Sequence, residues 1–170
     1  MPSDLSLLLR NAVDRELPHL RQFSAESASI KPVGAESWSP KQELGHLIDS
    51  AANNHIRFVR AALEPELVGL SYAQNDWVDI HAYQDMSWDA IVDFWAQYNG
   101  FIADLLNHIP EDKLRTNCII GKGDGVTLRF LIEDYVLHMQ HHIDHLLQRP
   151  VVTAYPAPQT APNQNKPAVL

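Results

Sequence analysis

The sequence predicts an all-α protein built as a single four-helix bundle. Four stretches of the chain carry apolar residues at helical spacing, and no convincing series of strands accompanies them. Helices of about 20 residues reach roughly 30 Å each, so four of them match in length and form one bundle economically. With 170 residues, of which 45% are hydrophobic and 20% charged, the chain suits one globular domain. We expect the bundle to span residues 1–149.

The first two predicted helices differ in how clearly their ends are marked. The first covers residues 3–24 and contains Pro18, which we expect to kink or divide it because proline lacks the N–H that an inner turn requires. The second covers residues 39–63 and has a clear start. Ser39 can cap it, a proline follows at the first helical position, and Gln42 completes a capping box.

The second half of the chain repeats this pattern with two long connections. The third helix is predicted from Ser87, a candidate cap, to Pro110, and the fourth covers residues 127–150. The connection at residues 64–86 is long for a compact domain, which favours a functional or irregularly packed segment. Residues 116–127 contain three glycines and are expected to form a small hairpin or an irregular turn.

Composition excludes several classes of function. The net charge is −8 without any basic cluster, so binding to nucleic acid is not expected. No apolar run is long enough to cross a membrane, and the N-terminus lacks the pattern of a secretory signal, so we expect a cytoplasmic protein. Cys118 is the only cysteine, which excludes an internal disulfide and favours a small buried apolar role. Residues 150–170 are rich in proline and predict an extended tail.

The histidines are the informative anomaly. The chain has nine, and four of them fall between residues 138 and 145. At about 100° per residue, His138, His141, His142 and His145 share roughly one third of the surface of the fourth helix. An i, i+4 pair places two imidazoles on one side, at a spacing suited to one metal ion. Both His138 with His142 and His141 with His145 have this spacing, and the spacing alone does not choose between them.

A third metal ligand has to come from another helix, and His46 is the best candidate. It lies on a stripe of the second helix with Gln42, Asp49 and Asn53. That stripe is unusually polar for a line facing the core. Buried polar groups are costly unless they are paired, and a metal ion would pair them. The sequence therefore predicts one metal site between the second and fourth helices.

Two segments resemble the DinB/YfiT-like superfamily of metal-binding four-helix bundles. They are WSPKQELGHLIDSAANNHIRFVRA, residues 38–61, and LIEDYVLHMQHHIDHLLQR, residues 131–149. The resemblance implies His46, His138 and His142 as the metal ligands, with zinc or nickel as the ion. It also implies a metal-dependent hydrolase, or an S-transferase that uses a low-molecular-weight thiol as co-substrate, and frequent homodimers. The expected partner is a small-molecule substrate.

Three neutral histidines leave an ion with open positions for water or substrate, as in catalytic sites. His145, one turn beyond His142, is then a candidate catalytic residue, as a proton shuttle or an additional ligand. Asp49 is a second candidate, able to orient a ligand or to accept a proton. Asp134, four residues before His138, is placed to hold that imidazole. A solvated surface carboxylate remains an equal alternative for both acids.

Two other functions compete with this interpretation. A carboxylate-bridged di-iron bundle needs two matched Glu-x-x-His motifs. The second helix has one that ends at His46, but the fourth helix lacks its counterpart, because Glu133 is followed three residues later by Val136. The second alternative is a non-catalytic bundle that binds a partner or dimerises, with a purely stabilising metal. It is favoured if residues 64–86 or the tail block the open side of the ion, and disfavoured if a cavity reaches it.

Overall fold

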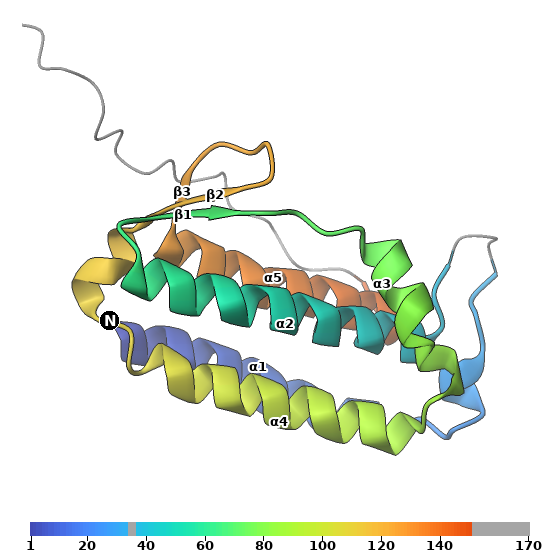
Figure 1. Ribbon diagram of the computed structural model, residues 1–170. Helices are drawn as coiled ribbons and strands as arrows, with labels where there is room; N and C mark the ends of the chain where they lie inside the picture. Colours follow the sequence, from blue (N-terminus) through green and yellow to red (C-terminus); the bar gives the residue numbers. More distant parts are fainter. Residues whose placement is uncertain (34–36, 151–170) are drawn as a thin grey trace, which may run out of the picture.

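The computed structural model describes residues 1–33 and 37–150, and these form a four-helix bundle with a small sheet at one side (Figure 1). Each long helix packs on two others in the cyclic order α1, α4, α2, α5. The arrangement therefore confirms the predicted fold class, while the proposed tail beyond residue 150 lies outside the described residues. The elements are α1 (Pro2–Leu20), α2 (Pro40–Leu63), β1 (Glu66–Gly69), α3 (Gln74–His81), α4 (Trp88–Leu106), β2 (Asn117–Ile120), β3 (Val126–Thr127) and α5 (Leu128–Leu146), with short 3-10 helices at Ser27–Ser29, Tyr83–Asp85 and Glu111–Arg115.

The two helices that carry the candidate ligands both start at side-chain caps. Ser39 and Gln42 form the predicted capping box, in which the Gln42 N–H donates to the Ser39 hydroxyl at 3.3 Å and the Ser39 N–H donates to the Gln42 amide oxygen at 3.2 Å. The Phe130 N–H donates to the Thr127 hydroxyl at 3.1 Å. Such caps satisfy N–H groups that have no partner within the helix. Ser87 stands at the start of α4 as predicted, but its side chain makes no capping hydrogen bond.

The ends of three helices were predicted about one turn too late. The helical spacing of apolar residues predicted ends at residue 24, Pro110 and Pro150, whereas α1, α4 and α5 end at Leu20, Leu106 and Leu146. Pro18 does not divide α1, because it lies in the last turn. Proline still removes the N–H that would bond to the carbonyl four residues earlier, but only two residues of the helix follow it.

The two long connections contain a three-stranded sheet, of which the sequence predicted only the possible hairpin at residues 116–127. β1 follows α2 and pairs in parallel with β2, while β2 pairs antiparallel with β3. The second pairing confirms the predicted hairpin in residues 116–127. The segment 64–86 also holds α3, which packs along α2 and, in Figure 1, lies at the end of the bundle opposite the sheet. This segment thus covers the outer side of α2 with ordered structure.

The core is formed by the inward faces of all four long helices. Trp88 and Trp95 of α4 are among the largest fully buried side chains, and the Trp88 indole N–H donates to the Leu20 carbonyl at 3.0 Å. Cys118 is fully buried, and burial raises the pKa of its thiol to about 12. It therefore acts as the apolar residue that was predicted. No helix in the described ranges combines the length and apolar character needed to span a membrane.

A buried carboxylate on α1 is paired with an arginine just beyond the end of α5, and this contact gives a first prediction. Glu16 is fully buried and accepts from Arg15 at 2.7 Å and Arg149 at 2.9 Å. Burial alone would raise the pKa of Glu16, but Arg149 and Arg15 together outweigh it and hold this pKa below its ordinary value of 4.5. Because the pKa of Glu16 is lower in the folded than in the unfolded protein, the ionised carboxylate stabilises the fold at pH values above the unfolded pKa. This stabilisation is lost as pH falls through the folded pKa.

We expect Glu16→Gln to lower the free energy of unfolding at pH 7 by about 1.5–3 kcal/mol, the range for a hydrogen bond to a charged group. The difference from wild type should shrink as pH falls below the ordinary carboxyl pKa of 4.5 and through the lower pKa of folded Glu16. Urea unfolding of both proteins at pH 7 and pH 3.5 measures this. A difference that is unchanged at pH 3.5 would show that the ion pair does not contribute.

Candidate metal centre

Three histidines from two helices meet at one point in the bundle. His46 comes from α2, and His138 and His142 come from successive turns of α5. Each offers a ring nitrogen, and the three nitrogens all lie within 4.8 Å of one another. The ring centroids are 4.4 Å apart for His138 and His142, 4.6 Å for His46 and His142, and 5.2 Å for His46 and His138. Among the described residues, this is the one such group of histidine, cysteine or acidic side chains.

The surroundings keep two of these rings neutral. His46 is 1% exposed, and burial followed by the charge of His142 lowers its pKa to about 4. Burial, then the neighbouring His142, His46 and His141, lower the pKa of His138 to about 3. At neutral pH both rings therefore keep lone pairs on nitrogen. Metal binding requires neutral imidazole, so protons do not compete strongly for this site.

The nitrogen geometry fits a shared ion. The Nε2 atoms of His46 and His138 are 3.3 Å apart. Two nitrogens bound to one zinc ion at about 2.0–2.1 Å and a tetrahedral angle are separated by roughly 3.3–3.4 Å. The Nδ1 atoms of both rings are buried and have no hydrogen-bond partner among the described residues. An ion held on the Nε2 atoms would leave both Nδ1 atoms without a partner, so the Nε2 spacing is the observation that supports a shared ion.

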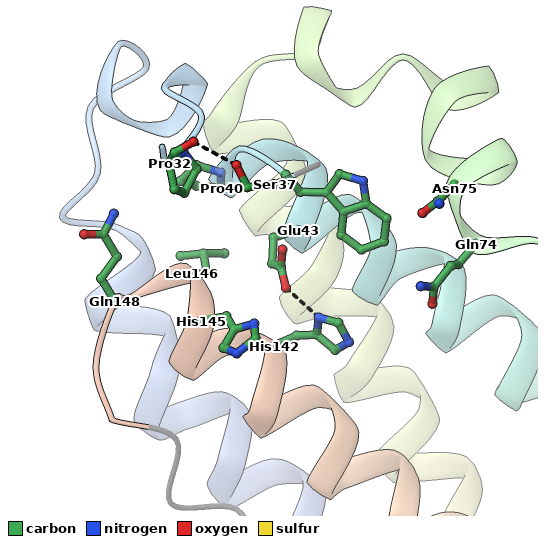
Figure 2. A pocket seen from close by; sticks show the side chains of 11 residues that line it. Pro32, Ser37, Pro40, Glu43, Gln74, Asn75, His142, His145, Leu146 and Gln148 are labelled. Atoms are coloured by element: carbon green, nitrogen blue, oxygen red, sulfur yellow. Dashed lines mark hydrogen bonds and ion pairs between the residues drawn. The ribbon is translucent and has the colours of Figure 1, made fainter. Parts of the chain in front are cut away.

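Glu43 holds the third histidine in place, and the sequence analysis did not assign it this role. The Nδ1 atom of His142 lies 2.5 Å from the Glu43 carboxylate and donates a hydrogen bond to it (Figure 2). This contact fixes the tautomer and leaves Nε2 of His142 for an ion. Carboxylates commonly orient metal-binding histidines in this way. The available signal was the position of Glu43 three residues before His46, on the same side of α2.

Two aromatic rings enclose His46. The Trp38 ring, which precedes α2, is 4.9 Å from the His46 ring between centroids, and the Tyr72 ring is 6.5 Å away. Tyr72 belongs to the segment after β1, and it also contacts Trp77 of α3 at 5.1 Å. These rings restrict the rotation of His46 and exclude water from one side of it. Tyr72 was missed because nothing in the sequence of that connection places it near α2.

The structure separates the four histidines of α5 into two pairs. His138 and His142 face His46, whereas His141 and His145 lie beside each other with ring centroids 4.6 Å apart. His145 is exposed, and its ring centroid is 6.5 Å from that of His142. Among the described residues, only the first pair converges with a third histidine, which favours His138 and His142 over the pair with equal spacing. His145 stays a predicted catalytic residue, at the edge of the site.

In the part of the chain that the structure describes, neither predicted acid forms a hydrogen bond with one of the three histidines. Asp49 is buried, and its Oδ1 atom accepts from the Tyr83 hydroxyl at 2.6 Å and from His81 Nδ1 at 3.0 Å. It therefore fixes the segment before α4 instead of His46. Asp134 is half-buried, but Nδ1 of His138 has no hydrogen-bond partner among the described residues. The i, i+4 spacing brings Asp134 to the same face of α5 without bringing it to that nitrogen.

Two cavities adjoin the three histidines from different sides. One has a volume of about 450 Å³ and is lined by His142, Glu43, Trp38 and His145, among others (Figure 2). The other has a volume of about 280 Å³ and includes His46 and His138 in its wall. Gln74 lines both. The segment 64–86 therefore forms part of the walls around the histidines and leaves space beside them.

Comparison with known proteins places this chain in a family. The family model described as the DinB superfamily matches residues 8–146. The chain belongs to the DinB superfamily. Among curated DinB-like relatives, a "putative metal-dependent hydrolase" of Bacillus licheniformis is 25% identical over 137 residues, which are 78% of each chain. A protein of the same description from Oceanobacillus iheyensis is 27% identical over 119 residues, or 64% of this chain and 63% of that protein.

Solved structures show the same DinB-like fold. YfiT from Bacillus subtilis, described as a probable metal-dependent hydrolase with an unusual four-helix bundle topology, superposes with a TM-score of 0.73 at 18% identity. The match covers 86% of this chain and 84% of YfiT. A mycothiol-dependent maleylpyruvate isomerase superposes with a TM-score of 0.68 at 14% identity, over 86% of this chain and 60% of the isomerase.

The contact between Glu43 and His142 gives a second prediction for this DinB protein. We expect Glu43→Gln to weaken zinc binding by about 10–100-fold, the usual cost of losing a group that orients a ligand. Competition with a chromophoric chelator measures the affinity. Glu64→Gln, at the far end of α2, is the matched control and should bind zinc like wild type. Equal affinity in the Glu43 variant would show that the carboxylate does not support the site.

Proposed function

We propose that this protein is a metal-dependent hydrolase in which His46, His138 and His142 hold one divalent ion, with zinc or nickel as the best candidates. The observation that carries the proposal is the convergence of three histidine nitrogens beside two cavities. Structural zinc sites are closed by four protein ligands, whereas catalytic sites keep a position for water or substrate. The cavities also argue against a purely stabilising metal, because they leave room for a ligand next to the histidines.

The side chains around the histidines supply the rest of the proposed chemistry. A divalent ion in this position would lower the pKa of a bound water and polarise a substrate carbonyl. Glu43 keeps the His142 ring oriented through the contact at Nδ1. His145 lines the larger cavity and is exposed, so its ring can exchange protons between that cavity and solvent. Trp38 excludes water from the His46 side.

Transfer of a low-molecular-weight thiol is the second candidate. The fold is shared with an isomerase named for its dependence on mycothiol, and a divalent ion can stabilise a thiolate. Cys118 cannot supply this thiol, because it is fully buried and burial raises its pKa to about 12. A thiol used by this site would therefore come from a separate molecule.

The test uses protein purified without a histidine tag and reloaded with zinc or nickel. It is assayed with simple esters and amides, and with a panel of electrophiles in the presence of a small thiol. We expect turnover that depends on the metal and disappears after chelation. The ester and amide panel separates hydrolysis from thiol transfer. Metal-loaded protein that is inactive in every assay would favour the non-catalytic alternative.

A further inference from the structure

The smaller cavity contains an unpaired positive charge. Arg57 of α2 is half-buried and lines this cavity together with His46 and His138. Its guanidinium donates to the Asn54 side-chain oxygen at 3.3 Å and to the Leu70 carbonyl at 2.8 Å. Both acceptors are neutral. Across the described ranges no carboxylate forms an ion pair with Arg57, although the nearby Arg60 is paired with Glu64 at 2.8 Å.

A partly buried charge without a counter-charge is costly. Burial lowers the pKa of Arg57, but arginine keeps its proton in proteins. The guanidinium has more N–H donors than its two neutral acceptors use. Asp134 also lines the cavity, but among the described residues no ion pair joins it to Arg57. The cavity wall therefore offers one guanidinium that makes no ion pair with a carboxylate of the described residues.

We propose that Arg57 binds the carboxylate of a small substrate or co-substrate whose reactive end lies at the three histidines. This inference rests on the proposed metal-dependent function. A carboxylate carries a single charge and so balances a single arginine, and its two oxygens match the arginine fork. The cavity of about 280 Å³ suits a small molecule. The net charge of −8 repels anions in general, so a preference for an anion has to arise locally.

The test compares two probes that differ only in charge. Zinc-loaded, tag-free protein is titrated by calorimetry with 3-mercaptopropionate and with its neutral amide, 3-mercaptopropionamide. We expect wild type to bind the carboxylate at least about tenfold more tightly, as expected for a charge-assisted hydrogen bond. Arg57→Gln should reduce the ratio of the two affinities, carboxylate over amide, to about one. Arg57→Lys should keep part of it, because lysine retains the charge without the fork.

Arg60→Gln is the matched control, since Arg60 lies one turn further along α2 and is not in the cavity wall. It should keep the wild-type ratio. A wild-type ratio near one, or a preference that survives in Arg57→Gln, would overturn the assignment of Arg57. The zinc content of the same samples is measured separately. Protein that takes up zinc but shows no preference contradicts this inference alone, whereas protein that takes up no zinc contradicts the proposed function as well.

Discussion

Replacing His46 with alanine is expected to abolish tight metal binding while leaving the helices folded. His46 is the one ligand candidate on α2, so its loss leaves two histidines on α5 and no connection between the helices through the ion. Losing a group that merely orients a ligand costs about 10–100-fold in affinity, and we expect the loss of a ligand to exceed about 100-fold. Metal content after dialysis and far-ultraviolet circular dichroism measure the two effects.

His145→Ala is the matched control for this experiment. His145 is exposed and lies outside the group of three nitrogens, so the variant should keep the wild-type metal content. The reverse result, retention in His46→Ala and loss in His145→Ala, would mean that the ion is held by His141 and His145. That result would contradict the assignment of the site.

Gly45→Ala is expected to destabilise the fold by about 2–3 kcal/mol. A Cβ atom on Gly45 would meet ring atoms of Tyr83, two of which lie within 2.5 Å of its position. The Tyr83 ring is buried and its hydroxyl donates to Asp49 at 2.6 Å, so the ring cannot move without breaking that contact. Overpacking costs about 1–3 kcal/mol and the lost hydrogen bond adds to it. The better helix propensity of alanine returns about 1 kcal/mol.

Gly100→Ala measures the effect of the higher helix propensity of alanine without a steric clash. Gly100 lies within α4, and a Cβ atom there would meet nothing within 4 Å in the part of the chain that the structure describes. This variant should be more stable than wild type by up to about 1 kcal/mol. Urea unfolding of both variants gives the comparison. Equal effects at the two positions would show that Tyr83 does not pack against Gly45.

The bundle could be predicted because its signals are local. Ser39 with Gln42, and Thr127, mark the starts of α2 and α5 through contacts within one turn. The parallel pairing of Glu66–Gly69 with Asn117–Ile120 joins segments far apart in the sequence. Strands of this length carry little alternation to reveal them. The helix ends were placed too late because periodicity alone does not show where the last turn stops.

For the candidate site too, the spacing within one helix could be read from the sequence, whereas the contacts between helices could not. The spacing of His138 and His142 was visible, but so was the equal spacing of His141 and His145, and only the packing of α2 against α5 separates the pairs. The spacing of Glu43 from His46 places both on one side of α2, but it does not show that Glu43 contacts His142 of α5. The homodimer, the cytoplasmic location and the identity of the metal stay predictions.

The metal content of tag-free protein tests the central claim most directly. The chain is purified, stripped with a chelator, reloaded with zinc or nickel, dialysed and analysed by inductively coupled plasma mass spectrometry. Three converging histidines predict about one ion per chain, retained through dialysis. Far less than one ion per chain after reloading, with the helices intact by circular dichroism, would contradict the claim that His46, His138 and His142 form a metal site.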